Sequence, residues 1–258
     1  RALRGAVPDF DRGFWGKLAA QGWLGILVPE DLGGAGLGLA EMRIIAEQLA
    51  RTLAPEPLAA CAVYARGMLQ HSANDALKQA LLPALAAGKL IPTVACAEST
   101  GFPDAGALPV TTAQQRGSRI ALNGVKRFVA PAAGAGGYVV SAREDGDLVL
   151  YWVPADSAGL TMAMTPRADG THAGTLQLND VAITAERRLA RGDGARSALA
   201  CAIDETVVIA SAELYGVMDA ALAITLDYLK TRQQFGKVIG SFQALAHRAV
   251  DLHVQVNL

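Results

Sequence analysis

The sequence predicts an α+β protein with an N-terminal helical domain, a middle antiparallel β-domain and an incomplete C-terminal helical bundle. Apolar residues recur with a helical period near both ends of the chain and with strand patterns in the middle. No helical stretch separates the expected strands, which excludes an alternating, doubly wound α/β sheet. We place the three domains at residues 1–90, 91–196 and 197–258.

The N-terminal domain is expected to consist of helices joined by loops. Apolar and aromatic residues recur at helical spacing over residues 10–18, and Gly22 is typical of a residue that ends a helix. A glycine-rich loop over residues 29–38 then leads into a second helix, which ends before Pro55. Two further helical stretches follow, and Asn74 is expected to cap the second of them.

The middle domain is expected to be built from short strands and tight turns. Residues 120–129 predict two strands around an Asn123–Gly124 turn, because Asn-Gly is a strong hairpin signal. A second hairpin is expected from residues 138–143 and 148–153, which flank the turn sequence Glu-Asp-Gly-Asp. Two more strands are expected at residues 175–178 and 181–183.

One long helix is expected to open the C-terminal domain. Residues 198–230 contain no proline and a single glycine, and their apolar side chains cover more than one helix face. Such a helix needs packing partners on several sides, so we expect the protein not to be monomeric. The Gly236–Gly240 region ends the long helix, and another helix begins at Phe242.

Composition and charge exclude several classes of partner. The 258 residues are 52% apolar and carry a formal net charge of −1, with Lys and Arg scattered along the chain. We therefore expect no nucleic-acid partner, and no membrane span, since apolar runs break before the roughly 18 residues that a span needs. Without a leader pattern, and with cysteines only at Cys61, Cys96 and Cys201, a cytoplasmic location is favoured. The chain begins without Met and stops inside helical sequence, so we expect it to be part of something longer.

Common catalytic and binding motifs are missing from the sequence. The glycine-rich residues 33–38 and 134–137 do not match G-x-G-x-x-G, and no P-loop is present. The four histidines are dispersed without HExxH or a Cys pair, so no metal site is expected. No G-x-S-x-G is found, and Cys96 is expected to be a small buried apolar residue. Residues 232–243 remain, either as a solvated helix end or as an Arg and an aromatic ring suited to a phosphate and a planar adenine.

Four segments of the sequence together resemble the acyl-CoA dehydrogenases, in the order in which that family has them. The resemblance covers nearly the whole chain, and its last segment is the most specific. Typical members are longer, so most of the C-terminal bundle is expected to be absent here. The four segments are residues 22–38 (GWLGILVPEDLGGAGLG), 122–126 (LNGVK), 176–189 (LQLNDVAITAERRL) and 232–243 (RQQFGKVIGSFQ).

The resemblance implies FAD as the cofactor and an acyl-CoA as the substrate. In this family FAD lies between the β-domain and the bundle, a glutamate removes the α-proton of the acyl group, and a hydride passes to flavin N5. By position, Arg232 and Phe235, with Gln243, would meet the adenine and pyrophosphate of a neighbouring subunit's FAD. Phe128 would lie beside the flavin ring, where the family usually has Trp.

Two motifs depart from the family's pattern at the flavin. Where the family has T-E-P-G-A-G-S-D, residues 97–104 read AESTGFPD, so Ala97 replaces a flavin-contacting Thr and Pro103 a substrate-contacting Ser. Where the family has W-[IT]-[ST]-N, residues 128–131 read FVAP, and Ala130 lacks the hydroxyl offered to flavin N5. Each lost hydrogen bond is worth about 0.5–1.5 kcal/mol.

The catalytic base has two possible positions in the resemblance. Most members place the glutamate in the part of the bundle that this sequence lacks. A minority place it early on the long helix, at the position of Thr206, with Glu205 one residue away as the candidate base. One residue is about 100° around a helix, and the other interpretation is an exposed Glu that stabilises the helix N-terminus. Asp204 is a further candidate for substrate binding.

Three hypotheses about function follow. The first is an oligomeric FAD-dependent dehydrogenase of fatty acid or lipid metabolism that oxidises the α,β bond of an acyl-CoA thioester and passes electrons to a flavoprotein or another acceptor. The second is a non-catalytic or FAD-lending subunit of a hetero-oligomeric acyl-CoA dehydrogenase. The third is an interaction protein that retains only the fold. Another flavin reaction, such as monooxygenation, is a variant of the first.

Overall fold

The computed structural model describes residue 3, residues 5–100 and residues 106–257. It divides into two compact units, the first formed by Arg1–Met42 and Pro55–Val208 and the second by Arg43–Ala54 and Ile209–Leu258. Helices precede the sheet and follow it along the chain, which confirms the predicted α+β class. The three sequence domains stay a prediction.

Short helices with defined caps form the N-terminal part of the first unit. The Asp11 side chain accepts hydrogen bonds from the backbone N–H groups of Gly13 and Phe14 and so caps the first helix. Asn74 caps the last of these helices by accepting from the N–H of Leu77, as the sequence predicted. The helices are α1 (Arg12–Ala20), α2 (Leu39–Arg51), whose later part belongs to the second unit, the π-helix η3 (Ala59–Ala65), α3 (Arg66–Gln70) and α4 (Asp75–Ala86).

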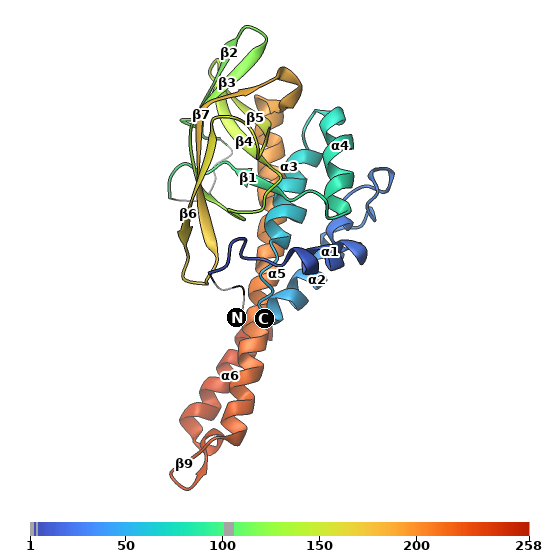
Figure 1. Ribbon diagram of the computed structural model, residues 1–258. Helices are drawn as coiled ribbons and strands as arrows, with labels where there is room; N and C mark the ends of the chain where they lie inside the picture. The colour runs from blue at the N-terminus through green and yellow to red at the C-terminus, as the bar shows by residue number, and fades with distance from the viewer. Residues whose placement is uncertain (1–2, 4, 101–105, 258) are drawn as a thin grey trace. The chain divides into compact units, whose positions relative to one another are not determined.

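One mostly antiparallel sheet forms the middle of the chain (Figure 1). Its strand order is β6-β7-β3-β2-β4-β5-β8, and β1 pairs with β4 in parallel. The strands are β1 (Pro92–Ala95), β2 (Thr112–Arg116), β3 (Arg119–Val129), β4 (Gly137–Glu144), β5 (Asp147–Pro154), β6 (Leu160–Pro166), β7 (His172–Ile183) and β8 (Arg188–Arg191).

The two predicted hairpins have different outcomes. The β4–β5 hairpin is confirmed, with Glu144 opposite Asp147 across a two-residue turn. The predicted turn at Asn123–Gly124 is wrong, because β3 is one strand with a β-bulge relative to β7 at this point. Glycine is needed at this position because the backbone of β3 lies close to Thr111. A Cβ on Gly124 would lie 2.4 Å from the Thr111 Oγ1 atom.

A similar irregularity explains the last two predicted strands. Residues 175–178 and 181–183 belong to the single strand β7. Asp180 between them has a φ of 53°, and its N–H donates to the Asn123 side chain at 2.9 Å. The apolar pattern of the sequence is interrupted where the backbone departs from the extended conformation, which is why two strands were predicted. In the structure, β7 pairs with β3 on both sides of this point.

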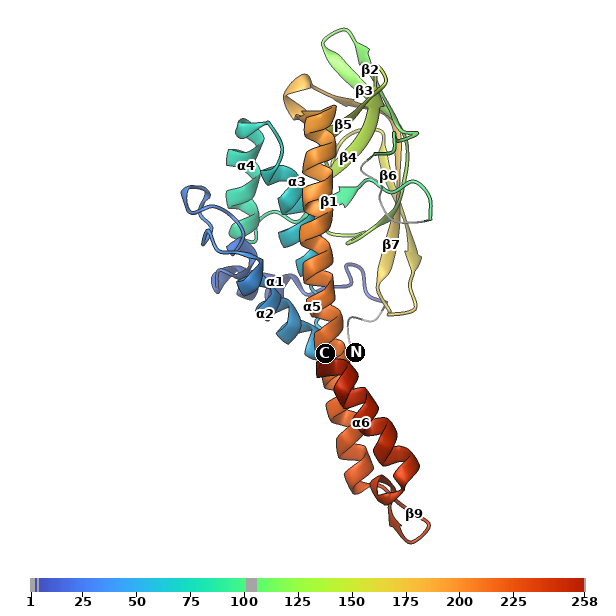
Figure 2. The same ribbon diagram turned by 180° about the vertical axis from the view of Figure 1, so that it is seen from behind.

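The core of the first unit covers both faces of β5. Leu148, Leu150 and Trp152 pack with residues of α3, α4 and the first part of the long helix α5 (Asp193–Thr231), whereas Val149 and Tyr151 pack within the sheet's other face. Figures 1 and 2 show this part of α5 between the sheet and helices α3 and α4. A strand buried on both faces has no alternation, which is why β5 reads as a continuous apolar run.

The second unit contains the rest of α5, residues 43–54 and helix α6 (Gln243–Asn257). A small hairpin of β9 (Gln233–Gln234) and β10 (Lys237–Val238) joins α5 to α6. Within this unit α2 and α5 approach closely at Gly216, where a Cβ would lie 2.3 Å from the Glu47 carbonyl oxygen. An ion pair between Arg51 and Asp219 also joins these two helices.

Helix α5 is longer and more apolar than the sequence analysis expected. It begins at Asp193 rather than near Ala198, so it has 39 residues. It contains an 18-residue window with a mean hydropathy of 1.7, which by length and composition alone is enough to cross a membrane. The expectation that apolar runs end too early for a span was therefore too strict for this helix. One such helix is weak support for a membrane protein, because helices that pack in a core have the same composition.

Candidate functional site

A buried ion pair lies at the end of β1, where this strand meets β3 and β4. Lys126 of β3 is fully buried, and its Nζ donates to Glu98 Oε1 at 2.7 Å and to Ser141 Oγ at 2.9 Å. The Glu98 carboxylate also accepts the backbone N–H groups of Val110 and Thr111, at 2.5 and 2.8 Å. One carboxylate thus holds both a buried cation and the chain that enters β2.

The environment of Glu98 keeps this carboxyl ionised. Burial disfavours the charged form, but hydrogen bonds from Lys126 and Thr111 outweigh it and lower the pKa of Glu98 below its ordinary value. Burial also lowers the pKa of Lys126, and the nearby Cys96 and Glu98 oppose that effect. The pair therefore satisfies a charge that could not stay buried alone.

The predicted flavin-facing residues of the first unit lie beside this ion pair. The Ala97 carbonyl oxygen accepts the N–H of Arg127 at 2.8 Å. Phe128 has a φ of 56° and a side chain that is 55% exposed. A left-handed backbone costs a residue like Phe about 1 kcal/mol or more, and such strain is concentrated at functional sites. Ala130 is half-buried, and Pro103 lies outside the described residues.

The predicted adenine-binding residues of the second unit gather at the β9–β10 hairpin. Its two turn residues, Phe235 and Gly236, both have positive φ, 53° and 78°, as in a type I′ turn. Asn, Asp or Gly is usual at such positions, so a Phe that is 90% exposed there requires a reason. The Phe235 ring meets Phe242 edge-on, with 6.2 Å between the ring centroids.

Arg232 and Gln243 flank the same hairpin. Arg232 is exposed, and among the described residues no carboxylate forms an ion pair with its guanidinium. Gln243 is exposed at the start of α6. An unpaired guanidinium, an exposed ring and an amide on one short segment can together bind a phosphate and a planar base.

These residues fit FAD better at its adenine end than at its flavin ring. The hairpin offers an exposed cation and an exposed aromatic ring, which are the kinds of group that can bind a pyrophosphate and an adenine. At the ring end, the exposed Phe128 offers a stacking surface, but Ala97 and Ala130 have no hydroxyl to donate. Backbone groups would have to hold the flavin there.

The candidate base Glu205 is already engaged in the first unit. Its Oε2 accepts from Arg66 Nη2 at 2.5 Å, and its Oε1 lies 2.9 Å from His71 Nε2. The Arg66 side chain is only 3% exposed, and burial lowers the pKa of its guanidinium while Glu205 opposes that effect. These contacts favour a structural role for Glu205, and its role as a base stays a prediction.

The alternative interpretation of Glu205 needs a correction. The residue is neither exposed nor near the helix N-terminus, because α5 begins 12 residues earlier at Asp193. Asp204, the substrate-binding candidate beside it, is exposed. Sequence reasoning missed Arg66, although a single Arg inside the apolar residues 58–69 was a signal for a buried partner.

Glu213 of α5 is another carboxylic acid that the sequence analysis did not single out. Burial raises its pKa from 4.5 to about 7. A Glu within the apolar run 207–218 was the available signal. A carboxyl whose pKa is raised to about 7 changes its charge near neutral pH.

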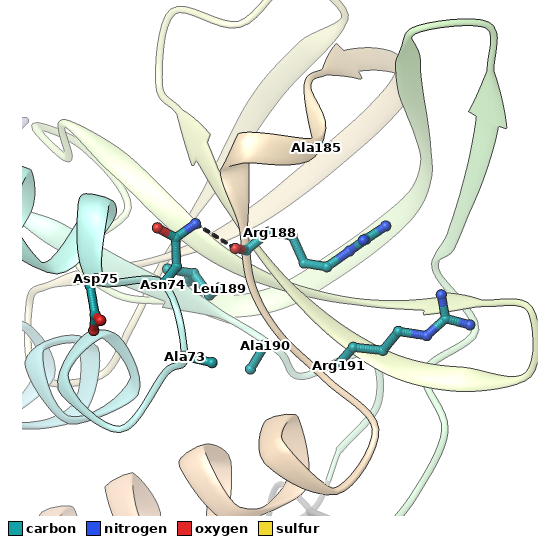
Figure 3. Close-up of a pocket in the computed structure, with 8 residues that line it drawn as sticks. All are labelled: Ala73, Asn74, Asp75, Ala185, Arg188, Leu189, Ala190 and Arg191. Carbon is teal, nitrogen blue, oxygen red and sulfur yellow. Dashed lines mark hydrogen bonds between the residues drawn. The ribbon is translucent and has the colours of Figure 1, made fainter.

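A hollow of about 420 Å³ lies between the start of α4 and strand β8. In Figure 3 Asn74 donates to the Arg188 carbonyl oxygen, and both arginine side chains point away from Asn74 and Asp75. Arg188 and Arg191 instead pair with Glu144. The charges of both arginines are therefore balanced by Glu144, and the hollow contains none of the predicted site residues.

Comparisons with known proteins identify the family and the fold. Family models for the acyl-CoA dehydrogenase N-terminal domain and C-terminal domain match residues 3–89 and 192–258. Acyl-CoA dehydrogenase FadE27 of Mycobacterium tuberculosis is 30% identical over 99% of this chain and 66% of its own length. The chain thus spans slightly less than two thirds of this relative.

Solved structures show the same fold. A structure described as a Tcur3481-Tcur3483 steroid ACAD G363A variant is 33% identical, with a TM-score of 0.86, over 100% of this chain and 68% of that one. The ChsE4-ChsE5 complex from Mycobacterium tuberculosis is 29% identical, with a TM-score of 0.87 and the same coverage of both chains. Since the models of both terminal domains match and the fold agrees, this chain belongs to the acyl-CoA dehydrogenase family.

Proposed function

We propose that this chain is a subunit of an FAD-dependent acyl-CoA dehydrogenase and binds the adenine and pyrophosphate end of FAD through its β9–β10 hairpin. FAD is the cofactor of the family. The observation that carries the proposal is the hairpin itself, where Phe235 is exposed on a left-handed backbone next to Arg232, which forms no ion pair within the described part of the chain. A ring held in a costly conformation outside any core is best explained by a ligand that it contacts.

The reaction of such an assembly is the α,β-dehydrogenation of an acyl-CoA thioester. A carboxylate base removes the α-proton, and bound FAD supplies the acceptor for the hydride from the β-carbon. In this chain Arg232 would pair with a phosphate, Phe235 would stack on adenine, and Gln243 would donate a hydrogen bond at the start of α6. Phe128 would stack beside the flavin ring.

A second candidate is a subunit whose hairpin residues bind the FAD of a partner chain, while its own flavin-ring and base positions catalyse no reaction. Two observations favour it. Ala97 and Ala130 lack hydroxyls at the flavin ring, and Glu205 is held by Arg66 and His71. Two of the similar structures bear two protein names each, which supports a pair of unlike chains.

The visible spectrum of the purified protein separates these candidates. Stoichiometric flavin bound by this chain alone supports a complete dehydrogenase subunit. Flavin that binds only when a second acyl-CoA dehydrogenase chain is co-expressed supports the lending subunit. Absence of flavin in both preparations would contradict both candidates and leave an interaction protein that retains the fold.

Variants of the hairpin test the binding residues directly. Arg232→Ala is expected to weaken FAD binding ten- to a hundredfold, since a charge-assisted hydrogen bond is worth about 1.5–3 kcal/mol. Arg248→Ala serves as the matched control, because Arg248 is also exposed but lies on α6 away from the hairpin. If both variants bind FAD like the wild type, the hairpin does not contact FAD.

A further inference from the structure

The Glu98–Lys126 ion pair joins four separate pieces of the chain. Glu98 follows β1, Lys126 is in β3, Ser141 is in β4, and Val110 and Thr111 lead into β2. All of them meet at the carboxylate of Glu98 or at the ammonium group of Lys126. The pair therefore fixes the relative positions of three strands and of the chain that enters β2.

The same contacts fix the backbone on both sides of Ala97. Ser141 Oγ donates to the Cys96 carbonyl oxygen at 3.4 Å, and Arg127 N–H donates to the Ala97 carbonyl oxygen at 2.8 Å. Glu98, the next residue, is held by Lys126 at 2.7 Å. Three consecutive residues are thus tied to β3 and β4 by three different hydrogen bonds.

Phe128 is two residues after Lys126 on the same strand. Its φ of 56° and its exposed ring persist only if the surrounding backbone is held firmly. Lys126 before it and Val129 after it are both fully buried, so the strand is anchored on either side of the ring. On the side before the ring, the ion pair holds the strand in place through the Lys126 side chain.

Stability of the fold does not by itself require a charged pair at this place. Two apolar residues of similar volume often stabilise a protein as well as a buried ion pair does, because the pair must first lose its hydration. What hydrogen-bonded charges add is a fixed geometry, since each acceptor and donor has a preferred distance and direction.

We propose that Glu98 and Lys126 are positioning residues, which hold the backbone of Ala97 and the ring of Phe128 in the arrangement that receives the flavin ring. The inference rests on the proposed function, in which Phe128 stacks beside that ring. With no hydroxyls at Ala97 and Ala130, these two described positions can offer the flavin only backbone groups, beside the aromatic surface of Phe128. Their placement therefore determines how well this end binds.

Two variants separate positioning from stability. Lys126→Met is expected to lower both the urea midpoint and the FAD affinity, because it leaves Glu98 without its cation. Glu98→Gln/Lys126→Met removes both charges, so its urea midpoint is expected to recover most of that loss. The remaining loss reflects the backbone N–H of Val110 or Thr111 that the single oxygen of the Gln amide no longer accepts. The FAD affinity of the double variant is expected to stay at least tenfold weaker, measured by quenching of FAD fluorescence with the full assembly.

Arg116→Met is the matched control. Arg116 forms an exposed ion pair with Asp180 on the same sheet, at 2.8 Å, and should leave FAD affinity unchanged. Wild-type affinity in the double variant would overturn the positioning role, as would an equal loss in Arg116→Met. A wild-type assembly that binds no FAD would instead refute the proposed function.

Amide hydrogen exchange gives a readout that needs no flavin. The Arg127 amide, which donates to Ala97, is expected to exchange at least tenfold faster in the double variant than in the wild type at equal global stability. Unchanged exchange at Arg127 would overturn the positioning role even where FAD binding cannot be measured.

Discussion

At the scale of single residues, burial of charge makes Glu213 sensitive to pH. Its pKa of about 7 in the folded protein lies well above the ordinary value of 4.5, so between these pH values the folded state holds a proton that the unfolded chain releases. The stabilisation is complete below about pH 4.5 and is lost as the pH rises through 7. We expect a loss of about 3 kcal/mol, since each pKa unit corresponds to about 1.4 kcal/mol.

Glu213→Gln tests this expectation, because Gln resembles the neutral acid. The difference in unfolding free energy between the variant and the wild type, from urea titrations, should grow between pH 4.5 and 7 in favour of the variant. Glu30→Gln, at an exposed position, should show no such growth. A difference that is constant across this range would contradict a raised pKa at Glu213.

Arg66 is another residue whose burial has a direct cost. Arg66→Met leaves Glu205 without its principal partner and is expected to destabilise the protein by about 3–5 kcal/mol. Arg66→Met/Glu205→Gln removes both charges and should recover most of that loss. Urea midpoints measure both effects. A small loss in the single variant, similar to the less than about 1 kcal/mol typical of exposed pairs, would show that water reaches the Arg66–Glu205 pair.

At the scale of elements, β3 depends on a close contact at its bulge. Gly124→Ala places a Cβ against the Thr111 side chain and backbone, with Oγ1 at 2.4 Å and Cα at 2.8 Å. Overpacking of this kind costs about 1–3 kcal/mol, which a shift of the melting temperature measures. Gly16→Ala is the control, because nothing lies within 4 Å of its new Cβ and α1 should tolerate Ala. Equal melting temperatures for the two variants would contradict the contact.

The elements also show what a sequence can and cannot predict. The β4–β5 hairpin was predictable because turn residues and apolar runs are local signals. The bulge at Gly124 was not, because its cause is Thr111, 13 residues away in the chain. Asn-Gly fits both a turn and this close approach, and only the tertiary contact distinguishes them.

The residues of the candidate site likewise fall into those that the sequence could predict and those that it could not. Arg232 and Phe235 could be proposed from the sequence, because one short segment carries them and resembles a known motif. The partners of Glu205 could not, since Arg66 lies 139 residues away and meets it only in the fold. The ion pair of Glu98 and Lys126 is likewise the product of strand pairing between distant segments.

At the scale of the whole molecule, apolar side chains on α5 and α6 predict association. Leu214 is 64% exposed, Ile224 71% and Val250 60%, and all three are on helices of the second unit. Monomeric proteins rarely leave such a surface in water, so we expect an oligomer at micromolar concentration, measured by light scattering. An exposed helix of this composition could also associate with lipid, and lipid vesicles added to the same sample test for it.

Charged substitutions test whether these helices form the interface of the oligomer. Ile224→Lys is expected to shift the oligomer towards monomer without loss of helix content, because the lysine would have to be buried at the interface. Met164→Lys on β6, at a position that is 41% exposed in the first unit, should leave the molar mass unchanged. A wild-type monomer, or an oligomer that Ile224→Lys does not weaken, would show that these helix faces do not mediate assembly. In that case Phe235 and Arg232 could not reach the FAD of another chain through this surface, and the lending role would need a different interface.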